Sequence, residues 1–220
     1  LESSGTFMYS HINATTSAVL YVLDPKNADL ADLGTVMGNV YHTKEEMIDC
    51  VNAFYEGMVQ RSEEMKRHPN YKTGENYAYL GLPPCFLIFD EYVAFFEMLG
   101  TKESVRLLSQ LKKIVMLGRQ AGYFLIVACQ RPDAKYFSDG IRDNFNFRVG
   151  LGRISELGYG MLFGSDVKKQ FFQKRIKGRG YCDVGTSVIS EFYTPLVPKG
   201  HDFLQEIGRL EEKRTASNES

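Results

Sequence analysis

The chain has 220 residues and a formal net charge of -1, and 44% of its residues are hydrophobic and 24% charged. This balance is typical of a globular protein, and the length allows a sizeable core. The near-zero net charge excludes a global attraction to nucleic acid or anionic lipid, so any such contact requires a local patch.

The first elements are an irregular segment and a strand. Residues 1–17 are rich in Ser, Thr and small side chains, which indicates an irregular N-terminal segment or linker. Residues 18–23 form a short apolar run that ends at Asp24 and Pro25. Such a run, bounded by a turn signal, predicts a buried parallel strand.

A helix and a second strand follow. Residues 43–66 have a helical apolar pattern, and Thr43 with Glu46 forms a capping box at its start. Residues 68–81 are polar and contain Pro, Asn and Gly, so they indicate a loop. Residues 85–89 form another apolar run and predict a second buried strand.

A second helix and a third strand complete the pattern. Residues 104–120 have helical periodicity, and Gly122 is the expected end of that helix. Its expected buried side comprises Val105, Leu108, Leu111, Val115 and Met116. Residues 123–129 predict a third strand. Strands alternating with helices predict an α/β fold with a largely parallel sheet flanked by helices.

The last part of the chain has weaker patterns. Residues 146–151, 180–184 and 189–197 are candidates for later strands, and residues 206–220 are polar and predict a tail. We therefore expect one large domain over residues 18–205.

Polar side chains follow each of the three expected strands. They are residues 24–26, the pair Asp90 and Glu91, and residues 130–132. The carboxyl ends of parallel strands share one edge of a sheet, and ligands bind there. We therefore expect the three polar clusters to converge.

Asp90 and Glu91 end a strongly apolar strand. Neighbouring acids at such a place can divide the work, because one carboxylate can hold Mg²⁺ and the next can orient or deprotonate an attacking water. The alternative is that two acids simply begin a loop.

Gln130 can donate to a phosphate and accept from a water, and Arg131 can pair with a phosphate. Their alternative is a polar loop start.

Several segments in order resemble the FtsK/SpoIIIE-type DNA translocases. They are residues 22–26 (VLDPK), 87–91 (LIFDE) and 128–132 (ACQRP). Residues 140–149 and 178–181 resemble the segments that follow in that family. The resemblance covers most of the chain and is strongest to coupling-type members carried by conjugative elements.

The resemblance implies a RecA-like P-loop NTPase core that hydrolyses ATP with Mg²⁺. It further implies a hexameric ring of identical subunits that moves double-stranded DNA, in conjugative or chromosomal transfer. Asp90 matches the family's metal-binding acid, Glu91 its water-activating acid, and Gln130 its γ-phosphate sensor. The other residues that the resemblance places at the nucleotide are Asp24, Lys26 and Arg131.

The same resemblance places an arginine that reaches a neighbouring subunit's nucleotide near Arg148. Arg142 and Arg153 are its rivals for that role. A separate basic stripe is a candidate for DNA contact, because lysines and arginines neutralise phosphates. It comprises Lys168, Lys169, Lys174, Arg175 and Lys177. The alternative is a solvated surface or a subunit contact.

One family motif is missing. The glycine-rich loop G-x-x-x-x-G-K-[ST], whose backbone N–H groups and lysine bind the phosphates, does not occur in this sequence. The first β-loop-α unit of the fold is therefore missing or altered. Three explanations stay open: a shortened or altered chain, a divergent member that has lost nucleotide binding, or residues 7–12 in the vacant strand position.

Three functions compete on this sequence. An ATP-driven motor is favoured by the acid pair, and a non-catalytic DNA-binding or assembly subunit by the missing loop. A metal-dependent nuclease or phosphatase would need further acids. The four scattered cysteines form no C-x-x-C pair, which argues against a zinc site and suits a reducing cytosol. We expect a cytoplasmic domain, which leaves room for a membrane-anchored segment outside this chain.

Overall fold

The computed structural model describes residues 18–130, 135–137, 139–167, 170–172, 176–186 and 188–218. The expected irregular segment over residues 1–17 therefore lies outside the described residues. The described chain divides into two compact units. The first holds the residues up to Cys129 and those from Asp202 onward, and the second holds those from Gln130 to His201.

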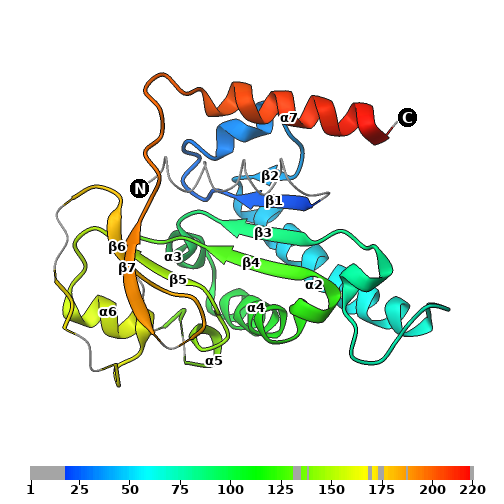
Figure 1. Ribbon diagram of the computed structural model, residues 1–220. Coiled ribbons are helices and arrows are strands. Elements are labelled where there is room, and N and C mark those ends of the chain that lie inside the picture. The colour runs from blue at the N-terminus through cyan, green and yellow to red at the C-terminus, as the bar shows by residue number, and fades with distance from the viewer. Residues whose placement is uncertain are drawn as a thin grey trace. The chain divides into compact units, whose positions relative to one another are not determined.

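The first unit contains a four-stranded parallel sheet with the order β2-β1-β3-β4 (Figure 1). Strand β1 covers Val19–Leu23, β2 Val40–Tyr41, β3 Cys85–Phe89 and β4 Tyr123–Val127. Strands β1, β3 and β4 confirm the three strands predicted from the apolar runs. Strand β2 was not predicted, because two residues are too few to show a pattern.

The three main strands end level with one another. Leu23 lies opposite Phe89, and Phe89 lies opposite Val127. Hydrogen bonds continue past the last residues, from the Asp90 N–H to the Leu23 oxygen (2.9 Å) and from the Ala128 N–H to the Phe89 oxygen (2.9 Å). The residues that follow β1, β3 and β4 therefore leave the sheet at the same edge, as predicted.

Two long helices pack together against one face of this sheet. Helix α2 covers Lys44–Arg67 and begins with the predicted capping box, in which the Thr43 side chain accepts from the backbone of the third helical residue. Helix α4 covers Thr101–Ala121. The ring of Phe54 from α2 lies edge-on to that of Tyr123 from β4, with 4.8 Å between centroids.

The predicted buried side of α4 was right at Leu111 and wrong at Val105 and Met116, which are 65% and 52% exposed. The buried positions are Leu107, Leu111, Ile114, Gly118 and Ala121. The helix has two apolar stripes, and periodicity alone does not say which one meets the sheet. Close approach decides it, because a side chain at Gly118 would collide with the backbone oxygen of Tyr123.

The opposite face of the sheet is covered by a short 3-10 helix, η1 (Ala31–Thr35), and by helix α7 (Phe203–Asn218). Leu33 and Ile207 from these helices join Leu20 and other sheet residues in one core cluster. Helix α7 replaces most of the polar tail expected from residue 206 onward. The helix was not predicted from the sequence, because it has few apolar side chains and its charged composition is also typical of a tail.

Two further short helices lie outside the layers described above, one after β3 and one in the loop before it. Helix α3 (Tyr92–Glu97) begins directly after Glu91, and the 3-10 helix η2 (Tyr77–Leu80) lies within the predicted loop. None of the helices in the described part of the chain has the length and apolar character needed to cross a membrane.

The second unit contains an antiparallel sheet of three strands, β5 (Arg148–Leu151), β6 (Arg179–Asp183) and β7 (Ile189–Tyr193), in that order. These confirm the later strands predicted from the sequence, although they form a sheet of their own. Helices α5 (Asp139–Arg142) and α6 (Glu156–Phe163) belong to the same unit. Its core cluster comprises Tyr159, Phe163, Tyr181 and Ile189.

Candidate functional site

Asp24 organises the loop after β1. Its side chain is fully buried, and its carboxylate accepts hydrogen bonds from the backbone N–H groups of Lys26 (3.1 Å), Ala28 (2.7 Å) and Ala31 (3.0 Å). A buried carboxylate is stable only when its oxygens are satisfied in this way. Both oxygens are engaged without a ligand, so a part for Asp24 in cofactor binding stays a prediction.

Glu91 has an unusual backbone conformation. It directly follows Asp90 at the end of β3, and its φ of 51° and ψ of 52° lie in the left-handed region. That conformation costs a residue with a Cβ about 1–2 kcal/mol. The Tyr92 N–H donates to the Ala128 oxygen (2.9 Å), which helps to hold the turn in place. Strain of this kind is concentrated at functional sites.

The side chains of Lys26 and Glu91 meet at the sheet edge. The Lys26 Nζ lies 3.2 Å from the Glu91 Oε1, and the two side chains are 46% and 16% exposed. The loop after β1 and the acid pair after β3 are thus joined by an ion pair. The predicted convergence is confirmed for these two clusters.

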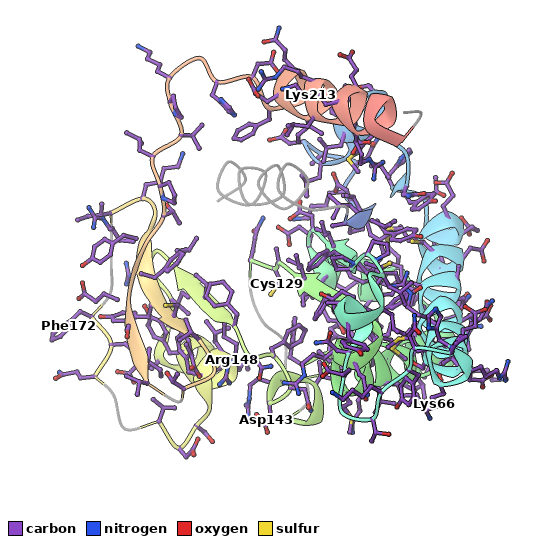
Figure 2. All side chains as sticks on the ribbon, turned by 45° about the vertical axis from the view of Figure 1, so that its right-hand side comes forward. Lys66, Cys129, Asp143, Arg148, Phe172 and Lys213 are labelled. Atoms are coloured by element: carbon purple, nitrogen blue, oxygen red, sulfur yellow. The ribbon has the colours of Figure 1, made fainter. Side chains whose placement is uncertain are left out.

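The charge of Glu91 also reaches the end of β4. Burial raises the pKa of the Cys129 thiol to about 12, and the negative charge of Glu91 adds to the rise. Figure 2 shows Cys129 just beyond the end of β4. Burial likewise raises the pKa of the Tyr92 phenol. The carboxylate of Glu91 therefore acts electrostatically on the end of β4, where Cys129 is partly buried.

Asp90 is only partly buried, and its backbone is held by the bond to Leu23. Within the described residues, no group of three or more His, Cys, Asp or Glu side chains could hold a metal ion. Mg²⁺ is commonly bound through one or two carboxylates, with water and substrate phosphates as the other ligands. Asp90 has the residue type of such a ligand, and Mg²⁺ binding at this site stays a prediction.

Gln130 and Arg131 follow β4. Gln130 is exposed and begins the second unit. Arg131 lies outside the described residues. The roles of both at a nucleotide stay predictions.

Arg148 is engaged within its own sheet, in the second unit (Figure 2). Its guanidinium contacts the Asp183 carboxylate (2.7 Å) across the β5–β6 pair and donates to the Leu162 oxygen (3.3 Å). The Arg148 and Asp183 side chains are only 17% and 3% exposed. Of the two rival arginines, Arg142 contacts Asp143 (3.1 Å) and Arg153 is exposed.

Most of the basic stripe lies outside the described residues, namely Lys168, Lys169, Lys174 and Arg175. Lys177 is described and exposed, in the turn before β6. Phe171 stacks on Tyr159 with 4.2 Å between ring centroids, so it packs inside the unit. The DNA-binding role of the stripe stays a prediction.

Sequence reasoning missed two features of this site. The left-handed conformation of Glu91 could not be predicted from its residue type, because this conformation is most common for Gly, Asn and Asp and not for Glu. The Lys26–Glu91 contact joins residues that are far apart in the chain. The only available signal was that both residues follow strands of one expected sheet.

No protein-family model matches the chain. The chain is 55% identical over 204 residues to the FtsK domain-containing protein YdcQ of Bacillus subtilis (strain 168), which corresponds to 91% of this chain and 42% of the relative. The chain thus spans less than half the length of that relative.

Two solved structures are similar in fold. One is the pCW3 conjugation coupling protein TcpA, a monomer with ATPγS, with a TM-score of 0.71 and 19% identity over 89% of this chain and 57% of that one. The other is EssC (ATPases 2 and 3) from Geobacillus thermodenitrificans, with a TM-score of 0.65 and 16% identity over 97% of this chain and 41% of that one.

These findings confirm the resemblance that the ordered motifs predicted. The parallel sheet flanked by helices matches the RecA-like P-loop ATPase fold of the similar structures. The chain is a homologue of an FtsK domain-containing protein, and its fold is similar to those of TcpA and EssC.

Proposed function

We propose that this chain is part of the motor domain of an ATP-driven, cytoplasmic double-stranded DNA translocase. The observation that carries the proposal is the edge of the parallel sheet in the first unit, where β1, β3 and β4 end opposite one another. There, Asp90 and the strained Glu91 leave β3 beside the loop of Lys26. An acid pair of this kind, in a homologue of an FtsK domain-containing protein, fits the hydrolytic side of a nucleotide site.

The two acids have separate tasks in this proposal. Asp90 holds Mg²⁺, together with water and phosphate oxygens, and the bound ion neutralises charge on the phosphates. Glu91 orients the attacking water and accepts its proton. Gln130 contacts the terminal phosphate, and Arg131 pairs with a phosphate.

The phosphate-binding loop is absent from this sequence. We propose that another part of the full protein supplies it, since the chain corresponds to only 42% of its relative. A triphosphate needs such donors, because its several negative charges are otherwise unpaired.

The subunits form a ring of identical copies in this proposal, and conjugative DNA transfer is the favoured setting because TcpA is a conjugation coupling protein. Arg148 is paired with Asp183 within its own unit. The exposed Arg153 is therefore the better candidate for an arginine that reaches a neighbour's nucleotide. Lys177 and the rest of the basic stripe contact the DNA backbone.

ATP hydrolysis by the full-length protein tests the proposal. We expect Glu91→Gln to lower the hydrolysis rate by about 10²–10⁴-fold and to leave ATP binding intact, because general-base catalysis contributes about that factor. Glu97→Gln is the matched control, since Glu97 is an exposed acid on the adjoining helix α3. Equal rates for both variants and the unmodified protein would refute the assignment of Glu91.

A second candidate is a non-catalytic DNA-binding or assembly subunit, which the missing phosphate loop supports. It predicts that the full-length protein binds DNA and shows no ATP binding. A nuclease or phosphatase is less favoured, because the described residues contain no cluster of metal ligands. DNA cleavage without ATP would restore that third candidate.

A further inference from the structure

We infer that Lys26 is a positioning residue that restrains Glu91 at rest and releases it when nucleotide phosphates attract the lysine. The inference rests on the proposed function, because it assigns a resting state to the same site. It differs from the expectation that Lys26 only binds phosphate. The ion pair itself, at 3.2 Å between the Lys26 Nζ and the Glu91 Oε1, is the starting observation.

Both backbones of this pair are held firmly. The loop of Lys26 is fastened to Asp24 by three backbone N–H groups, one of which belongs to Lys26 itself. Glu91 lies between two hydrogen-bonded neighbours, Asp90 and Tyr92, whose N–H groups bond to the last residue of β1 and to the residue after β4. Any rearrangement is therefore confined to the two side chains.

The two side chains differ in exposure, and that difference decides which one moves. The Lys26 side chain is 46% exposed and ends a flexible four-carbon stem, whereas the Glu91 side chain is 16% exposed. The lysine can turn into solvent at little cost. The Glu91 carboxylate is the more buried partner and is less well hydrated when it is left alone, so it gains more from the pair.

The negative charge of the bound phosphates releases Lys26 from Glu91. A carboxylate carries one negative charge, and a bound triphosphate carries several, so phosphate competes successfully for the ammonium group. While Lys26 stays on the carboxylate, it draws electron density from the oxygen that must accept the proton of the attacking water. Departure of the lysine leaves Glu91 as the better base, so catalysis is coupled to occupancy of the site.

The ion pair is tested first by zero-length crosslinking with a water-soluble carbodiimide, which joins a carboxylate to an amine in contact. The full-length protein without nucleotide should give a Lys26–Glu91 crosslinked peptide in mass spectrometry. The Lys44–Glu103 pair is an internal control, because its 2.9 Å contact and 31% and 38% exposed side chains make it equally reactive. ATPγS with Mg²⁺ should remove the first crosslink and preserve the second.

Kinetics test the release. In this scheme the lysine has already left Glu91 when ATP is bound, so Lys26→Met should raise KM and leave the single-turnover rate at saturating ATP within about twofold of that of the unmodified protein. Lys26→Arg should restore KM, because arginine also pairs with phosphate. A single-turnover rate that rises by about fivefold in Lys26→Met, the most that one partly exposed ion pair can contribute, would show that the lysine still restrains Glu91 with ATP bound, and would refute the release.

The outcomes separate this inference from the proposed function. A control crosslink without a Lys26–Glu91 crosslink refutes the resting pair, whatever the protein does with ATP. Hydrolysis that proceeds while ATPγS leaves both crosslinks unchanged refutes the release. A full-length protein that forms both crosslinks and binds no nucleotide overturns the proposed function and, with it, the release step.

Discussion

The clearest prediction concerns Asp24, because its carboxylate accepts three backbone N–H groups. The amide of Asp24→Asn has one oxygen, which can serve Ala28 and Ala31, and its NH₂ group then faces the N–H of Lys26. One bond is lost, two donors oppose each other, and the remaining bonds lose their charge assistance. Bonds to charged groups contribute about 1.5–3 kcal/mol each, so we expect a loss of about 2–4 kcal/mol in the free energy of unfolding.

Urea unfolding of the nucleotide-free protein measures this loss, with linear extrapolation to water. Hydrogen exchange of the Ala28 and Ala31 amides should accelerate in the variant, because their acceptor is weakened. Asp32→Asn is the matched control, since Asp32 is an exposed carboxylate in the adjoining η1 helix and its change should stay within about 0.5 kcal/mol. If Asp24→Asn is as stable as this control, Asp24 does not organise the loop and the expected role at the nucleotide regains support.

The remaining predictions concern Arg148, Lys177 and Cys129. Arg148→Ala should lower the free energy of unfolding by about 3 kcal/mol, because it leaves the Asp183 carboxylate buried and unpaired; unchanged stability with lost ATP hydrolysis would instead make Arg148 catalytic. Lys177→Ala should weaken DNA binding and reduce the slope of log K against log salt by about one, and an unchanged slope would remove Lys177 from the interface. Cys129 should react slowly with iodoacetamide at pH 8, because its pKa is raised from 9.0 to about 12, and Glu91→Gln should speed the reaction by removing a negative charge. The same shift means that the unfolded thiol ionises first, so stability should fall as pH rises from about 9 to 12; alkylation as fast as that of a free thiol would contradict both expectations.

The sequence by itself determined the three main strands and the acids at their ends. Short apolar runs such as residues 85–89 can only be buried, and the polar residues that follow them end the strand locally. The start of α2 was equally readable, because a capping box depends on residues three apart. The family resemblance was readable for the same reason, since ordered motifs are a property of the chain alone.

Tertiary structure decided which surfaces and side chains meet. The apolar stripe of α4 that faces the sheet was chosen by the close approach at Gly118, which periodicity does not register. Helix α7 could be recognised only in the tertiary structure, where Ile207 packs in the same core cluster as Leu33 of η1. The later strands were readable, but their separate antiparallel sheet depends on pairing partners that no local pattern specifies.

At the site, too, the sequence determined the residue types and the fold determined which of them are in contact. Residue type alone marked Asp24, Lys26 and Glu91 as polar ends of strands. Only the fold turned the carboxylate of Asp24 inward onto backbone N–H groups and brought Lys26 onto Glu91. Local sequence sets where a strand ends, whereas the partner of a charged side chain depends on which other strand end the sheet places beside it.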